Sequence, residues 1–94
     1  MEYDAPVINI GNQPIEHYLL NIYSMLLTKQ KKFYLRAVGK SINHALNLMN
    51  ILNNEIFPNF FLINYLTNVV EKDNIHVSEL IMEVEINDSG FMSD

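Results

Sequence analysis

The sequence predicts a two-layer α/β sandwich in which two helices cover one face of a four-stranded mixed sheet. Two segments, beginning near Ile15 and Ser41, repeat apolar residues at the helical period, and a short strand-like run precedes each of them. Two long extended segments then follow one another across a short polar break, as in a hairpin. The order strand-helix-strand-helix-strand-strand, with right-handed crossovers, puts both helices on one side of the sheet.

The first strand and helix are separated by a turn that contains glycine and proline. Residues 7–10 form a short apolar run that ends at Gly11, and Pro14 suits the first turn of a helix. The helix ends near Thr28, where the apolar period stops. Its expected core face consists of Ile15, Tyr18, Leu19, Ile22, Met25 and Leu26.

The second strand and helix meet at Gly39. In the strand, Phe33, Leu35 and Ala37 alternate with Tyr34, Arg36 and Val38, so Arg36 should point away from the core. Ser41 could be the N-cap of the helix, although Lys40 could already lie in its first turn, and Pro58 ends the helix. The expected core face of this helix consists of Ile42, Ala45, Leu46, Met49, Leu52 and Ile56.

The last two strands are predicted over residues 60–71 and 75–86, joined by Lys72-Asp73-Asn74. In the final strand one face is apolar, with Leu80, Met82, Val84 and Ile86, and the other carries Glu79, Glu83 and Glu85 beside Ile81. We therefore expect one domain over residues 5–86, followed by a flexible C-terminal tail over residues 87–94.

Charge is segregated along the chain. The formal net charge is −5, yet five of the six basic residues fall between Lys29 and Lys40, and Lys72 is the sixth. There is no cysteine, and no apolar run approaches the ~20 residues of a membrane span, so we expect a soluble cytoplasmic protein with no membrane partner.

Catalytic and metal-binding signals are weak. The three histidines lie far apart in sequence, and none has the spacing of a helical metal pair. No nucleophile elbow or phosphate-binding loop accompanies Ser41 and His44. We therefore expect no enzyme activity, no catalytic residues, no metal and no cofactor.

Two sequence blocks resemble the signature blocks of the Alba family. The first is INIGNQPI, residues 8–15, followed by Tyr18, and the second is RAVGKSI, residues 36–42, followed by Ala45. Their spacing, and the Phe57-Pro58 pair that closes the second helix, are also similar. The resemblance implies the fold shared with the C-terminal domain of bacterial translation initiation factor three. It also implies a dimer that binds DNA or RNA, since the family includes archaeal chromatin proteins and relatives of RNase P and MRP subunits.

The resemblance also implies where nucleic acid would bind. The candidate nucleic-acid-binding residues are Asn12, Gln13, Arg36, Lys40 and Lys72. Asn12 and Gln13 stand where the family usually has two lysines, and Val38 replaces a commonly basic residue. The long basic hairpin arm of the family is expected here to be cut to residues 72–74. We therefore expect weakened or specialised binding, because fewer cations release fewer counterions.

Several alternatives accompany this interpretation. Arg36 could pair with a nearby glutamate. Lys31 and Lys32 are expected to be solvated turn residues that raise the local potential without a defined contact. Four tyrosines could be core or dimer-interface residues or could stack on single-stranded bases: Tyr18, Tyr23, Tyr34 and Tyr65. The whole chain could be an acidic interaction subunit that forms a heterodimer with a basic Alba paralogue and binds little nucleic acid itself. A small anion could also bind at the helix starts after Gly11 or Gly39.

Overall fold

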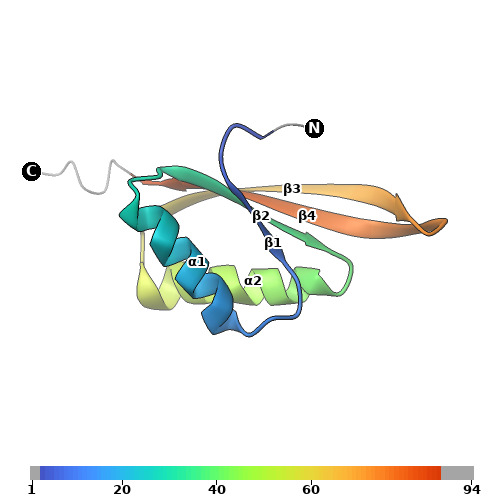
Figure 1. Ribbon diagram of the computed structural model, residues 1–94, viewed down its shortest axis with the longest axis horizontal. Helices are drawn as coiled ribbons and strands as arrows, with labels where there is room; N and C mark the ends of the chain where they lie inside the picture. Colours follow the sequence, from blue (N-terminus) through green and yellow to red (C-terminus); the bar gives the residue numbers. More distant parts are fainter. Residues whose placement is uncertain (1–2, 88–94) are drawn as a thin grey trace, which may run out of the picture.

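A four-stranded sheet and a pair of helices on one of its faces make up the fold (Figure 1). Residues 3–87 are described, in a computed structural model. The strands lie in the order β1-β2-β4-β3, with β1 parallel to β2 and the other neighbours antiparallel. The predicted two-layer α/β sandwich and its order of elements are confirmed. The face of the sheet opposite the helices is called the open face below.

The first strand and helix follow the predicted pattern. β1 spans Val7–Ile10 and α1 spans Ile15–Leu27, with Pro14 at the N-cap rather than inside the first turn. Proline suits this position because its φ angle is fixed and it needs no partner for an N–H group. Tyr18 and Ile22 are buried in the core, as their place on the apolar stripe predicted.

β2, Lys32–Val38, lies between β1 and β4 and alternates its side chains between the two faces of the sheet. Phe33, Leu35 and Ala37 enter the core between sheet and helices, where each is at most 2% exposed. Arg36 consequently lies on the open face, as predicted.

The second helix differs from its prediction at the start. α2 spans Ser41–Ile51 and continues into a π-helical segment, η1 (Leu52–Ile56). Lys40 occupies the N-cap with helical backbone angles, so Ser41 is not the cap and the alternative that the helix begins at Lys40 is the nearer one. Gly39 provides the reversal before the helix because its φ of 59° lies in the left-handed region that glycine tolerates.

The buried stripe of the second helix agrees with the predicted one at most positions and differs from it at two. Leu48 is fully buried together with Ala45 and Leu52, at the helical spacing i, i+3, i+7. Leu46 was expected in the core but is 41% exposed. It lies on the flank of the helix, where it lines a groove with Tyr65 of the hairpin.

The hairpin has a two-residue turn. β3 spans Phe61–Lys72 and β4 spans Ile75–Ile86, and Lys72 still pairs with Ile75. Asp73 and Asn74 have φ angles of 53° and 63°, the two positive values of a type I′ turn. The predicted loop was therefore one residue too long.

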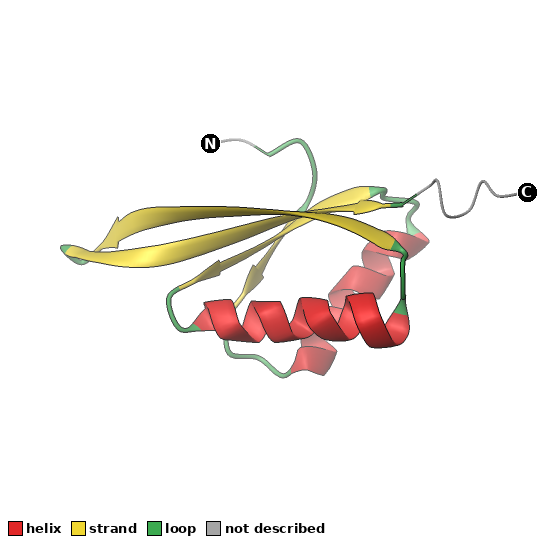
Figure 2. Ribbon diagram, turned by 180° about the vertical axis from the view of Figure 1, so that it is seen from behind, coloured by secondary structure: helices red, strands yellow, loops and turns green. Residues whose placement is uncertain are grey.

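The two strands of the hairpin continue beyond the rest of the sheet. The register of β2 on β4 ends at the pair Val38–Glu79, so residues 69–72 and 75–78 pair only with each other. Figure 2 shows this two-stranded projection, called the arm below, extending past the helices. The expectation that the arm is cut to residues 72–74 was wrong, because the strands themselves form it.

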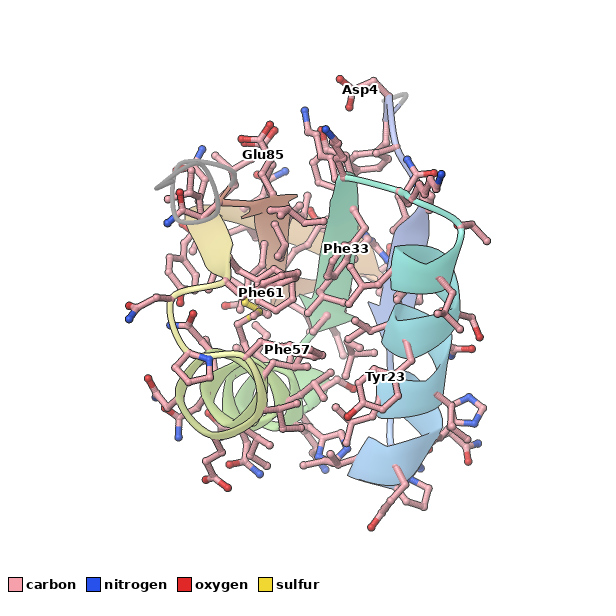
Figure 3. The ribbon with its side chains drawn as sticks, turned by 90° about the vertical axis from the view of Figure 1, so that its left-hand side faces the viewer. Asp4, Tyr23, Phe33, Phe57, Phe61 and Glu85 are labelled. Atoms are coloured by element: carbon pink, nitrogen blue, oxygen red, sulfur yellow. The ribbon has the colours of Figure 1, made fainter. Side chains whose placement is uncertain are left out.

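Aromatic rings fill one end of the core. Phe57 follows η1, and its ring lies 5.8 Å from Phe61 and 6.0 Å from Tyr23 on α1. Phe61 in turn meets Phe33 of β2 edge to face at 6.1 Å. Figure 3 shows these labelled rings between the sheet and the helices, with Asp4 on the open side of the sheet. Sheet and helices are joined here by burial of large apolar area.

Two further expectations concern the ends of the chain. The predicted tail over residues 87–94 lies almost wholly outside the described residues, which end at Asn87. The domain boundary 5–86 stays a prediction. Within residues 3–87, neither helix is long and apolar enough to cross a membrane.

Candidate nucleic-acid interface

The loop between β1 and α1 is held by the hydroxyl of Tyr18. This oxygen accepts hydrogen bonds from the backbone N–H groups of Gly11, at 2.7 Å, and of Gln13, at 3.1 Å. Because Tyr18 is only 3% exposed, the loop is tied to a fixed point in the core. The side chains of Asn12 and Gln13 remain exposed at its surface.

His44 links this loop to the start of α2. Its Nε2 donates to the carbonyl oxygen of Gln13 at 2.7 Å, and its ring meets Tyr18 edge to face at 5.9 Å. His17 contacts the same tyrosine ring at 5.2 Å. Two histidines that are far apart in sequence therefore flank Tyr18. Among residues 3–87, no group of three or more His, Asp or Glu side chains is placed to hold a metal ion.

Lys40 stands at the N-terminal end of α2. Its side chain is exposed, and the first turn of the helix contains no acidic residue. The N–H of Gly39 donates to the carbonyl of Ser78 at 2.8 Å. The charge of Lys40 adds to the positive end of the helix dipole, which favours an anion. However, the N–H groups of Gly11 and Gly39 are both occupied within the protein, which weakens the hypothesis of a small-anion site after each glycine.

Arg36 forms an ion pair on the open face. Its Nε donates to Oε2 of Glu79 at 2.5 Å across the β2–β4 pair. The Glu79 side chain is 7% exposed, and that of Arg36 is 34% exposed. Arg36 is therefore paired with a glutamate, one of the two alternatives given for it, and the pair has no net charge.

Lys32 is also paired with acidic groups. Its ammonium lies 3.0 Å from Glu83 and 3.2 Å from Asp4, and the Tyr34 hydroxyl donates to Asp4 at 2.8 Å. The hydrogen bond from Tyr34 and then that from Lys32 lower the pKa of Asp4. The hydrogen bond from Lys32 lowers the pKa of Glu83. The contact with Glu83, ahead of those with Tyr34 and Asp4, raises the pKa of Lys32. Lys32 is a paired strand residue, so its prediction as a solvated turn residue was wrong.

A hollow of about 480 Å³ brings the second sequence block and the arm together. Arg36, Val38 and Ser41 line it from β2 and α2, and Glu71 and Lys72 line it from β3. Lys72 is therefore near the block that contains Arg36, although the two are distant in sequence. Glu71 offsets part of the positive charge in this hollow.

Two solved structures resemble this arrangement of elements. Alba from Thermoplasma volcanium has a TM-score of 0.68 at 20% sequence identity, over 84% of this chain and 98% of that chain. ALBA1 from Trypanosoma brucei has a TM-score of 0.65 at 17% identity, over 94% of this chain and 75% of that chain. The chain has the Alba fold. No protein-family model and no curated protein matches its sequence.

Within this Alba fold, the predicted residues divide into two groups. Asn12 and Gln13 lie on the loop that His44 connects to α2, and Lys40 begins that helix. Arg36 and Lys72 line the hollow beside Ser41, the residue after Lys40. The name arm end is used below for the part of the surface with Asn12, Gln13, Lys40 and Lys72.

Tyr18 and His44 also shape this surface, and neither was predicted from the sequence to do so. Tyr18 was expected in the core, and it is there, but its hydroxyl also fixes the loop. A buried tyrosine usually has a hydrogen-bond partner, so a glycine turn just before it is the available signal. The contact of His44 depends on tertiary packing and has no comparable signal in the sequence.

Proposed function

We propose that this chain binds nucleic acid, DNA or RNA, through the arm end. The observation that carries the proposal is Lys40, exposed at the positive end of α2 and beside the fixed loop with Asn12 and Gln13. Lysine and the helix dipole attract a phosphate, and the two amide side chains can hydrogen-bond to phosphates or base edges. The Alba fold supports the same assignment. A cytoplasmic, chromosome-associated location would fit it.

The binding should be weak and sensitive to salt. Lys32 and Arg36 are paired with carboxylates, and the chain as a whole carries a net charge of −5. Lys40 and Lys72 are then the main cations of the arm end. If both meet phosphates of a duplex, the slope of log K against log salt should be about −2, far shallower than for a strongly basic protein.

We further propose that the chain works as a dimer. A groove runs between the second helix and β3 as two hollows that share Leu46, one with Ile42 and Val69 in its lining and one with Tyr65 beside asparagine side chains. Leu46, Tyr65 and Val69 are 41%, 53% and 61% exposed, which is unusual for neighbouring large apolar side chains in a protein that works alone. A second subunit would cover this groove.

A second candidate function follows from the paired cations. The chain could be the acidic subunit of a heterodimer, with a basic Alba paralogue that supplies most of the phosphate contacts. The charge of −5 would favour association with a cationic partner, chiefly through association rate and specificity. In this case the same groove would bind the paralogue.

Fluorescence anisotropy over a range of salt concentrations separates the two candidates. Duplex DNA, single-stranded DNA and structured RNA are titrated with this chain alone and with an equimolar basic Alba protein. Binding by the chain alone, reduced as salt rises, supports the first function. Binding only by the mixture, together with a mixed dimer in light scattering, supports the second. No binding of any nucleic acid at about 50 mM salt by either sample contradicts both, since phosphate contacts are strongest there.

A further inference from the structure

The open face of the sheet has a groove that the proposed phosphate contacts do not use. Its volume is about 500 Å³, within the range of small-molecule sites. It lies near the N-terminal segment, which crosses the open side of the sheet before β1 (Figure 1). The side chains that matter here are Tyr3, Arg36, Leu66, Asn68, Glu79 and Ile81.

An aromatic ring is held at one side of this groove. The ring of Tyr3 packs on that of Tyr34, with centroids 4.8 Å apart. The next residue, Asp4, accepts a hydrogen bond from the Tyr34 hydroxyl at 2.8 Å and pairs with Lys32 at 3.2 Å. These contacts hold the segment that carries the Tyr3 ring. Leu66 and Ile81, paired across β3 and β4, supply the apolar part of the groove.

The polar part of the groove offers both donors and acceptors. Glu79 is the one buried charged residue among those described, and its partner Arg36 uses Nε for the bond between them. A guanidinium has five N–H donors, and a carboxylate has about four acceptor positions, so one bond exhausts neither group. Asn68 accepts from the N–H of Val69 through Oδ1 at 2.9 Å, which leaves its NH₂ as a donor.

The aromatic, apolar and polar groups of this groove together indicate which class of ligand it suits. The ion pair is neutral, and Glu79 would repel a phosphate at close range, so the groove does not suit the backbone of a nucleic acid. A flat heteroaromatic ring with donors and acceptors on its edge suits it better. Such a ring can stack on Tyr3 and exchange hydrogen bonds with Arg36, Glu79 or Asn68.

We propose that this groove binds one unpaired nucleobase of a single-stranded nucleic acid. The inference rests on the proposed function and adds a preference to it. Lys40 and Lys72 would attract the backbone of any nucleic acid, whereas the groove would favour one whose bases are free of pairing. In a duplex the base edges are paired and the faces are stacked, so a duplex would not reach Tyr3 in this way.

Nucleosides test the groove directly because they lack phosphate. The common ribonucleosides are titrated into the ¹⁵N-labelled full chain up to about 10 mM, a range that detects ligands with a Kd near 1 mM. At least one should shift the signals of the Arg36 Nε–H and the Asn68 amide. Tyr3→Ala should abolish these shifts, and Tyr3→Phe should retain them since it keeps the ring.

Leu66→Ala should also weaken the nucleoside shifts. Leu62→Ala is its matched control, because Leu62 lies on the same strand and face, is 54% exposed, and is not part of the groove lining. Thermal melts of all variants establish that they are folded. Shifts for no nucleoside in the unaltered chain, or equal shifts in the Tyr3→Ala variant, would overturn the proposal.

Longer nucleic acids separate this proposal from the proposed function. Tyr3→Ala should weaken binding of single-stranded RNA about fivefold or more and leave duplex binding unchanged. If RNA binds and Tyr3→Ala has no effect, the proposal of a base in the groove is contradicted while the proposed function stands. If nucleosides bind and neither RNA nor DNA does, the groove stands while the proposed function fails. An equal loss of affinity for duplex and single-stranded nucleic acid would show that Tyr3 contacts the nucleic-acid backbone. It would overturn the proposal of a base in the groove.

Discussion

The Tyr18 hydroxyl is the single group on which the geometry of the loop at residues 11–13 depends most. Two backbone N–H groups, of Gly11 and Gln13, donate to one oxygen at the edge of the core. Sequence periodicity was sufficient to place Tyr18 in the core, because it repeats with Ile15 and Ile22 along α1. It could not identify the two donors, because they depend on the path of the loop after β1.

Removal of this hydroxyl should destabilise the protein. In the Tyr18→Phe variant the ring still packs, but two partly buried N–H groups lose their acceptor. We expect the free energy of unfolding to fall by about 1 to 3 kcal/mol in urea titrations. Tyr23→Phe is the control, since it removes a hydroxyl from the same helix while the ring keeps its contact with Phe57. Equal stability of the Tyr18→Phe variant and the parent would contradict the assigned role.

Lys32 should make stability depend on pH in the acid range. Asp4 and Glu83 have ordinary pKa values of 3.8 and 4.5, and their contacts with Tyr34 and Lys32 lower both pKa values in the folded state. A carboxyl whose pKa is lowered by folding stabilises the folded protein at pH values above the pKa that the group has in the unfolded chain. This contribution is lost as the pH falls through the folded value.

Lys32→Met tests this dependence because it keeps the length of the side chain and removes its charge. The stability difference between the parent and this variant should be full near neutral pH. It should shrink as the pH falls below about 4, when the carboxylates become protonated. Urea unfolding at a series of pH values measures it. A difference that stays constant down to about pH 2 would show that the ion pairs contribute nothing.

At the level of elements, the alternating and helical patterns were sufficient to predict both helices, all four strands and their order along the chain. Of the predicted core face of the second helix, Leu46 alone was wrong, because an apolar residue on the flank of a helix cannot be told from a core residue by period alone. The ion pair of Arg36 with Glu79 depends on the register of β2 on β4, a long-range feature that neither strand encodes by itself.

The arm is the element least supported by the rest of the fold. Its residues 69–72 and 75–78 have only each other as strand partners, apart from the bond of the Gly39 N–H to Ser78 at its base, and a two-stranded ribbon alone is marginally stable. Backbone amides of the arm should exchange with solvent faster than those of Phe33 and Leu35. The turn should control the rate of this exchange, because the arm forms only when Asp73 and Asn74 both adopt positive φ angles.

Substitutions at Asn74 test the turn. Asn74→Val should destabilise the arm by about 1 to 2 kcal/mol, because a β-branched residue resists a left-handed conformation. Asn74→Gly should stabilise the arm or leave it unchanged. Hydrogen exchange of the arm amides, followed by NMR, measures both variants. Slower exchange in the valine variant than in the glycine variant would contradict the type I′ turn.

At the level of the whole molecule, the distribution of charge matters more than its sum. Five basic residues lie close together in sequence, but the fold places acidic partners against Lys32 and Arg36. The sequence could predict the segregation of charge. It could not predict which cations would be neutralised, since Asp4, Glu79 and Glu83 reach them through the assembled sheet.

The groove between α2 and β3 predicts self-association or pairing with a paralogue. Leu46→Glu should weaken the dimer about tenfold or more, because the groove would then bury a charge without a partner. Leu20→Glu is the control, since Leu20 is also an exposed leucine on a helix, at 65% exposure, and lies outside the groove. Light scattering after size-exclusion chromatography gives the mass of each. The groove would be excluded as the interface if both variants kept the mass of the parent.

The most direct test of the central claim compares the salt dependence of nucleic-acid binding in two lysine variants. Lys40→Ala removes the exposed charge at the start of α2, and Lys29→Ala removes an exposed charge just beyond the C-terminal end of α1. We predict that Lys40→Ala weakens binding and reduces the slope of log K against log salt by about one unit, while Lys29→Ala changes neither. Equal slopes and affinities in both variants would contradict binding at the arm end.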